Sequence, residues 1–287
     1  MLPSFFVSDL HGRTDRYRTL FDLVRREVPR GVFFGGDLLP HGMDLKWRTS
    51  SDQIDFLEDF LLPELRKLRE DLGDDYPRLF VILGNDDPRV HEETMLEAEQ
   101  DDLLCYLHGR TAEYGPFPVY GYSCIPPSPF QLKDWERYDV SRFVDPGCVS
   151  PEEGRRTTGP DNRVIRNTTI EKELAELAGA DGLAEAICLF HCPPYGCGLD
   201  RAALDGKRID HVPLDVHIGS IAIQKFIARR QPLLTLHGHV HESCTLTGKW
   251  SERFDRTVSF SAATEEPRLA LVRFDPHDPG AAVRELR

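Results

Sequence analysis

The sequence predicts an α/β fold that begins with a parallel sheet. Apolar stretches at residues 5–8, 31–34 and 79–83 are each typical of a short buried strand, and helical periodicity at 17–24 and 54–68 separates them. Successive strand–loop–helix units imply parallel strands joined by right-handed crossovers. Ligands bind beyond the carboxyl ends of such strands, so we expect the loops that follow them to meet at one edge.

The second half of the chain is less regular. Residues 126–168 are rich in proline, glycine and charge, and we expect a long surface excursion or lid there. With no internal repeat or clear linker, residues 1–287 are expected to form a single domain. The other expected elements are helices at 95–107, 169–177 and 218–229, strands at 119–122, 186–190 and 233–236, and a closing antiparallel set at 245–250, 258–262 and 269–274.

Composition narrows the classes of partner. The formal net charge of −13 disfavours binding to nucleic acid or to an anionic membrane surface, but not to a small anionic substrate held by metal ions. The seven cysteines form no CxxC pair, which indicates reduced thiols and a cytoplasmic protein. The N-terminus lacks the basic region of a signal peptide, and no apolar run approaches the length of a membrane span.

Side chains of the kind that bind metals follow five of the apolar strands. Carboxylate, imidazole and amide groups without cysteine suit Mn²⁺, Fe²⁺ or Zn²⁺ better than a thiolate zinc site. Seven such groups are more than one ion usually takes from a protein and are about right for two. They are Asp9, His11, Asp37, Asn85, His191, His239 and His241.

Three alternating histidines give the last strand its distinctive end. Residues two apart in an extended chain point to the same side, so His237, His239 and His241 are expected to face one way. Any one of them alone is more often a hydrogen-bonded structural residue than a metal ligand.

The order of these residues resembles the calcineurin-like metallophosphoesterase superfamily. Two further stretches, His191-Cys192-Pro193-Pro194-Tyr195-Gly196 with Leu199-Asp200 and residues 219–234, resemble a little-characterised prokaryotic, Icc-like branch. The family motifs D-x-H, G-D, G-N-H-[DE], a lone H and G-H-x-H stand here as Asp9-Leu10-His11, Gly36-Asp37, Gly84-Asn85-Asp86-Asp87, His191 and Gly238-His239-Val240-His241. The resemblance implies the calcineurin-like fold, a four-layer α/β/β/α sandwich of two mixed β-sheets flanked by helices.

The resemblance also implies a role for each ligand. It assigns one metal to Asp9, His11, Asp37 and His241, and the other to Asp37, Asn85, His191 and His239. Asp37 would bridge two divalent ions, Mn²⁺ most of all, with Fe²⁺/Fe³⁺, Zn²⁺ or Ni²⁺ as alternatives. In the family, such ions clamp phosphate oxygens and generate a bridging hydroxide that acts as the nucleophile. His237 has no family role and is expected to pack beside the site.

One position departs from the family pattern. Asp86 stands where the family has the histidine that is its usual proton donor. A carboxylate beside two cations should be ionised and a poor general acid. Either the enzyme relies on its metals and on leaving groups that need no proton, or activity has been lost. An extra anion near the phosphate should also repel a dianionic monoester more than a monoanionic diester.

Roles for the remaining polar residues stay open. Asp87 either keeps the family's acidic position or caps the following helix. Asn85 and Arg208 are candidate substrate-binding residues, although Arg208 is more simply a solvated side chain. His211 and His217 flank the loop that follows His191 and are expected to be structural.

The sequence therefore predicts a dimetal phosphoesterase that hydrolyses a phosphodiester or phosphoanhydride bond of a small phosphorylated substrate. The alternative is a catalytically weak or silent metal-binding interaction scaffold on the same fold. A nuclease is disfavoured by the acidic charge. Nothing in the sequence decides whether the chain forms a homo-oligomer.

Overall fold

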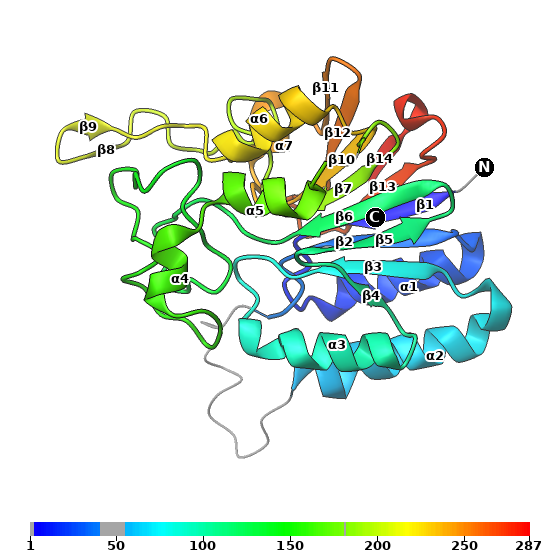
Figure 1. The fold of residues 1–287 in the computed structure, drawn as a ribbon. Coiled ribbons are helices and arrows are strands. Elements are labelled where there is room, and N and C mark those ends of the chain that lie inside the picture. The colour runs from blue at the N-terminus through cyan, green and yellow to red at the C-terminus, as the bar shows by residue number, and fades with distance from the viewer. Residues whose placement is uncertain (1–2, 41–54, 181) are drawn as a thin grey trace.

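Two six-stranded β-sheets form the centre of the molecule. The computed structural model describes residues 3–40, 55–180 and 182–287. Helices cover the outer face of each sheet, with α1, α2 and α3 on one side and α5, α6 and α7 on the other (Figure 1). This is the α/β/β/α arrangement of two mixed sheets that the resemblance implied, and the expected fold class is confirmed.

The first sheet combines a parallel half with an antiparallel edge. As predicted, β1, β2 and β3 pair in parallel, and β4 continues them. The C-terminal strands β13 and β14 add to the other edge antiparallel. In spatial order the strands are β14 (Val283–Leu286), β13 (Ala270–Phe274), β1 (Ser4–Val7), β2 (Gly31–Gly35), β3 (Arg78–Ile82) and β4 (Cys105–Tyr106).

The second sheet has four parallel strands between two antiparallel edge strands. Strands β12, β10, β7 and β6 are parallel neighbours, and β11 and β5 close the edges. A separate hairpin of β8 (Arg208–Ile209) and β9 (Val212–Pro213) extends away from both sheets (Figure 1). In spatial order the strands are β11 (Ser251–Phe254), β12 (Thr257–Ser261), β10 (Leu234–His237), β7 (Ile187–Phe190), β6 (Phe117–Tyr122) and β5 (Arg110–Tyr114).

The helices begin and end where local chemistry favours it. Thr169 caps α5, as expected, by accepting a hydrogen bond from the Lys172 amide at 3.2 Å. The helix expected at 54–68 is a short π-helical stretch, Leu57–Leu61, that continues into α2, and Ile54 lies outside the described residues. The helices are α1 (Thr14–Glu27), α2 (Leu62–Leu72), α3 (Glu92–Gln100), α4 (Asn162–Asn167), α5 (Ile170–Ala178), α6 (Ile221–Arg230) and α7 (Ser243–Thr247).

Two predicted elements were wrong. The helix expected at 95–107 ends at Gln100, because Asp102 adopts a left-handed backbone conformation (φ 57°) and the apolar residues beyond it form β4. The strand expected at 245–250 is the short helix α7, which Gly248 ends at φ 71°. The closing set is also not one antiparallel unit, since β12 runs parallel to β10 and β13 joins the other sheet.

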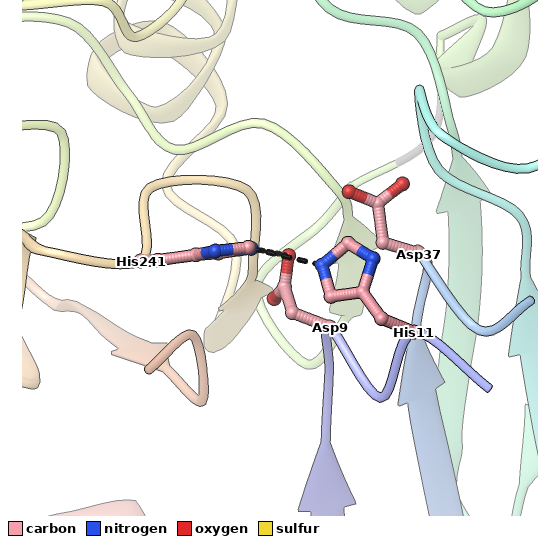
Figure 2. Close-up of side chains that lie close together, drawn as sticks. All are labelled: Asp9, His11, Asp37 and His241. Carbon is pink, nitrogen blue, oxygen red and sulfur yellow. Dashed lines mark hydrogen bonds and ion pairs between the residues drawn. The ribbon is translucent and has the colours of Figure 1, made fainter. Parts of the chain in front are cut away.

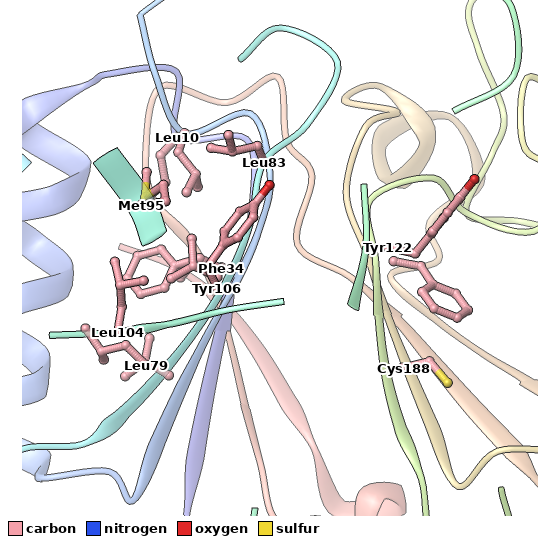
Figure 3. Packing of buried hydrophobic residues seen from close by; sticks show 14 of the residues in the cluster. Leu10, Phe34, Leu79, Leu83, Met95, Leu104, Tyr106, Tyr122 and Cys188 are labelled. Carbon is pink, nitrogen blue, oxygen red and sulfur yellow. The ribbon is translucent and has the colours of Figure 1, made fainter. Parts of the chain in front are cut away.

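Apolar side chains fill the space between the sheets and beneath the helices. Phe33 and Phe80 stack between the sheets with their ring centroids 4.8 Å apart. A second cluster packs the outer faces against the helices, with Phe34, Met95 and Tyr106 among its members (Figure 3). Strands buried on both faces read as continuous apolar runs, which is why the sequence signal for them was clear. Within the described residues, no helix is long and apolar enough to cross a membrane.

The segment 126–168 lies at the surface only in part. Its middle residues Lys133, Asp134, Trp135 and Glu136 are fully buried. The Lys133 ammonium meets the Glu136 carboxylate at 2.6 Å, so this buried charge is paired. The segment is anchored in the interior at this point, which sequence composition did not indicate.

Candidate metal centre

The predicted ligands come together because the strands that carry them end at one edge. Asp9, Asp37 and Asn85 follow β1, β2 and β3 of the first sheet. His191 follows β7 of the second sheet, and His239 and His241 follow β10. Since the five strands are parallel within their sheets, their carboxyl ends place these loops side by side.

Four of the ligands form a compact group. Asp9, His11, Asp37 and His241 each offer one ligand atom, and these atoms lie within 4.8 Å of one another. The Nε2 atoms of His11 and His241 are 3.1 Å apart, and His241 Nε2 lies 3.2 Å from Asp9 Oδ1 (Figure 2). This is a spacing at which one cation could contact all four side chains.

The other three candidate ligands, Asn85, His191 and His239, lie near Asp37 and near one another. His191 Nε2 lies 3.4 Å from Asp37 Oδ2 and 3.0 Å from Asn85 Oδ1. The ring of His239 is 5.3 Å from the ring of His191, between centroids. Asp37 thus lies within 4.8 Å of ligand atoms of the first expected group and 3.4 Å from His191 of the second.

A backbone carbonyl fixes the orientation of His191. The imidazole is fully buried, and its Nδ1 lies 2.7 Å from the carbonyl oxygen of Gly35. A carbonyl can only accept, so Nδ1 carries the proton and Nε2 faces Asp37 and Asn85. Metal-binding histidines in proteins are commonly held in this way.

The expectation that the three alternating histidines face one way was wrong. Strand β10 ends at His237, and His239 turns the chain with a left-handed backbone (φ 71°). Both nitrogens of His237 are hydrogen-bonded inside the protein, Nδ1 to the Cys192 carbonyl at 2.9 Å and Nε2 to the Thr235 hydroxyl at 2.7 Å. This places His237 in the packing between the strands.

Four of the ten non-glycine residues with a left-handed backbone in the described part of the chain are candidate ligands. Asp9, His11, Asp37 and His239 have φ angles of 56°, 47°, 52° and 71°. A non-glycine residue in the left-handed region costs roughly 1–2 kcal/mol. Such strain persists where the surrounding structure enforces it, most often at functional sites.

Glycines allow the ligand loops to approach closely. A Cβ atom on Gly84 would lie 2.4 Å from Asp37 Oδ1, and one on Gly238 would lie 2.6 Å from Asp9 Oδ2. Both distances are too short for any side chain, so the carboxylates occupy space that only glycine leaves open.

Asp87 holds the two ligand loops of the first sheet together. Its buried carboxylate accepts hydrogen bonds from the amides of Leu38 at 3.1 Å, Leu39 at 2.7 Å and Gly84 at 2.8 Å. It does not cap the helix that follows, which was one of its two expected roles. Burial and the nearby Asp37 carboxylate raise the pKa of Asp87 to about 7. The nearest sequence signal was its place in the motif, but that did not reveal which amides it would bind.

Asp86 lies at the rim of the ligand group. Its Oδ2 is 3.8 Å from His11 Nδ1, and its Oδ1 accepts a hydrogen bond from the Asn85 amide at 3.0 Å. Its own backbone N–H donates to Asp37 Oδ1 at 2.8 Å. The carboxylate is therefore close to where a substrate would meet the ligands.

The electrostatics fit a divalent cation. Burial disfavours protonated histidine, but Asp37 outweighs it and raises the pKa of His191 to about 10. Asp9 does the same for His241, whose pKa rises to about 9. Burial and the charge of His191 lower the pKa of His239 to about 4. The two carboxylates thus attract positive charge into the site, where the oxygen and nitrogen donors suit a metal ion.

Arg208 lies apart from the ligand loops. It is exposed on β8, in the hairpin that extends farthest from the sheets (Figure 1). In the described part of the chain, no contact between Arg208 and a ligand residue is seen. Its role in substrate binding stays a prediction.

Comparisons with known proteins agree with this geometry. The calcineurin-like phosphoesterase family model matches residues 2–243. Curated proteins gave no match. One solved crystal structure, 17% identical, superposes with a TM-score of 0.61 over 99% of this chain and 98% of that chain.

Two further solved structures share the fold. A phosphopantetheinyl hydrolase from Mycobacterium tuberculosis is 12% identical, with a TM-score of 0.51 over 92% of this chain and 89% of that one. A dimetal phosphatase from Danio rerio is 13% identical, with a TM-score of 0.50 over 95% of this chain and 91% of that one. The family match over most of the chain shows that this protein belongs to the calcineurin-like phosphoesterase family.

Proposed function

We propose that this protein is a dimetal-dependent phosphoesterase that hydrolyses a phosphodiester or a phosphoanhydride. The observation that carries the proposal is the position of Asp37, which lies close to candidate ligands of both groups. In this proposal one ion, Mn²⁺ most of all, is held by Asp9, His11, Asp37 and His241. The second is held by Asp37, Asn85, His191 and His239.

The residues around the ligands prepare the site. Two divalent ions, when bound, clamp phosphate oxygens and make a water acidic enough to attack phosphorus. Gly35 fixes the tautomer of His191, and the Asp86 amide orients Asp37. Holding these groups in place beforehand lowers the cost of reorganisation during the reaction.

Asp86 supports a preference for diesters. Its carboxylate lies beside His11 at the rim, where a substrate phosphate would approach. A second negative charge on a monoester would add a repulsion of about 1 kcal/mol at 4 Å in water, and more where water is excluded. We therefore propose that diesters are hydrolysed faster than the matching monoesters.

Kinetics on matched esters test this function. With Mn²⁺ added, bis(4-nitrophenyl) phosphate should be hydrolysed with a higher kcat/KM than 4-nitrophenyl phosphate. In the Asp86→Asn variant, the ratio of kcat/KM on the diester to kcat/KM on the monoester should be smaller than in the wild type. Asp101→Asn, which changes an exposed carboxylate, should leave this ratio unchanged. A clear monoester preference in the wild type would sink the diester proposal.

A metal-binding scaffold is the second candidate. The observation that favours it is Asp86, a carboxylate in place of the family's proton-donor histidine. The retained ligand set favours the enzyme instead, because a decayed site would be expected to lose ligands. Filled metal sites without turnover of either ester would decide for the scaffold.

We also propose a compartment, a domain organisation and a family branch for this protein. All seven cysteines are free, which is compatible with a reducing compartment such as the cytoplasm. We propose a single domain over residues 1–287, a small phosphorylated substrate, and placement in the Icc-like prokaryotic branch of the family.

A further inference from the structure

We propose that His217, held by the buried carboxylate of Asp200, donates a proton to the leaving group, the task that the family gives to the histidine whose place Asp86 takes here. This proposal rests on the phosphoesterase function proposed above. It assigns a chemical role to a histidine outside the family motifs.

The Asp200 carboxylate is fully buried and accepts four hydrogen bonds. Three come from the backbone amides of Gly196 at 2.9 Å, Cys197 at 2.9 Å and Gly219 at 3.2 Å. The fourth comes from His217 Nδ1 at 2.7 Å. Because Asp200 acts as an acceptor throughout, Nδ1 carries a proton and Nε2 is the nitrogen turned away from it.

An Asp–His pair of this kind serves proton transfer elsewhere in enzymology. The carboxylate fixes the ring and stabilises the imidazolium, and the second nitrogen exchanges the proton. The His217 side chain is 31% exposed, whereas Asp200 is 0% exposed. Part of the His217 ring is therefore within reach of solvent, from which it could recover a proton.

The loop that carries His217 is tied to the loop that carries His191. The Ser220 amide donates to the Pro193 carbonyl at 2.9 Å, and the Tyr195 amide donates to the Ser220 carbonyl at 3.0 Å. The segment before α6 therefore lies beside residues 193–195, which follow His191 in the chain. Both lie at the carboxyl end of β7, the edge where the ligands gather.

A second connection reaches His241. The Ala202 amide donates to the Val216 carbonyl at 2.8 Å, directly before His217. The next residue, Ala203, donates its amide to the Glu242 carboxylate at 3.0 Å. Glu242 is the neighbour of His241 in the chain, so the segment that contains His217 is held by hydrogen bonds next to His191 on one side and next to His241 on the other.

Besides Asp200, the groups of the described residues near His217 include Tyr195, Asp215 and Arg201, and Asp145 interacts electrostatically with Tyr195 and Asp215. The Tyr195 ring lies edge-on with its centroid 5.8 Å away, and its hydroxyl donates to Asp215 at 2.7 Å. Asp215 also accepts the His217 amide at 2.9 Å, and Arg201 pairs with His217 through the backbone. These contacts fix the ring without occupying Nε2.

The proposed step balances as follows. A water oxygen bonds to phosphorus, and the bond from phosphorus to the leaving oxygen breaks with its electron pair on that oxygen. The leaving oxygen takes the proton from His217 Nε2. The proton on Nδ1 stays there and remains hydrogen-bonded to Asp200. The proton lost by the attacking water passes to solvent, and solvent restores the proton on Nε2.

The test compares two diesters that differ in leaving group alone, methyl phenyl phosphate and methyl 4-nitrophenyl phosphate. In His217→Asn the amide nitrogen replaces Nδ1 and keeps the bond to Asp200, but the donor at Nε2 is lost. Phenolate needs a proton more than nitrophenolate does. We expect about a 10²-fold loss of kcat on the phenyl ester and only a few-fold loss on the nitrophenyl ester.

Two further variants keep the test sharp. His211→Asn, in the turn of the β8–β9 hairpin, is the matched control and should change neither rate. His217→Gln removes the same proton with a different side-chain length, and should repeat the pattern if His217→Asn folds poorly. Unchanged metal content in each variant separates proton donation from loss of the metal centre.

Three results would overturn the proposal. Equal losses on both esters would mean that His217 acts through loop structure, and no loss on either would mean that it has no role. In both cases a wild type active on the nitrophenyl ester would leave the phosphoesterase function standing. A wild type with filled metal sites that is inactive on both esters would overturn the function and this proposal together.

Discussion

Asp87 offers a quantitative test of how the ligand loops are held. Its carboxylate accepts three backbone hydrogen bonds, two on Oδ2 from Leu38 and Gly84 and one on Oδ1 from Leu39. In Asp87→Asn the single amide oxygen can keep the first two, but the amide nitrogen then faces the Leu39 N–H. One charge-assisted bond is lost and a buried donor is left unsatisfied.

The magnitude follows from competing effects. A lost hydrogen bond to a charged group costs about 1.5–3 kcal/mol, and the orphaned amide adds about 1–3 kcal/mol. Burial and repulsion from Asp37 raise the pKa of Asp87 to about 7. Removing the charge relieves both of these costs. We expect a net loss of about 2 kcal/mol in the free energy of unfolding at pH 8.

Chemical denaturation with a chelator present measures this loss without a contribution from bound metal. Asp22→Asn is the control, because it removes a carboxylate that is 73% exposed. That change should stay within about 0.5 kcal/mol. If Asp87→Asn and Asp22→Asn unfold at the same denaturant concentration, Asp87 does not hold the loops and the argument fails.

Three other predictions concern the same region. His11→Gly and His11→Ala both remove a candidate ligand, but only glycine relieves the backbone strain at φ 47°. In thermal unfolding with a chelator present, the glycine variant should therefore be more stable than the alanine variant by about 1 kcal/mol. Equal stability of the two variants would contradict the strain argument. Gly238→Ala would bring a Cβ atom 2.0 Å from Ser8 Oγ and should lose bound metal in elemental analysis, whereas Gly182→Ala, with no atom within 4 Å, should not. Trp135→Phe removes the bond from Nε1 to the Asp87 carbonyl at 2.7 Å and should cost about 1–3 kcal/mol in denaturant unfolding; no measurable change would show that this anchor is dispensable.

The grouping of the candidate ligands could largely be predicted from the sequence because its signals are local. Each ligand directly follows an apolar strand, and parallel strands share an edge. Residues two positions apart, such as Asp9 and His11, lie close together in space whatever the rest of the chain does. The fold class followed from the same strand pattern and from the family resemblance.

What could not be predicted depends on contacts between distant residues. Asp87 bonds to amides nearly fifty positions earlier in the chain, and Asp200 and His217 meet across a loop. Neither pairing leaves a periodic pattern. The alternation of the three histidines alone would have grouped His237 with the ligands, but alternation holds only while the strand continues, and the backbone turns at His239.

The central claim is that two metal ions share Asp37. Elemental analysis of the protein after saturation with Mn²⁺ and gel filtration tests it most directly. We expect about two ions per chain in the wild type, about one in His239→Ala, and fewer than one in Asp37→Ala. A wild type that holds no more than one ion, or a His239→Ala variant that still holds two, would contradict it.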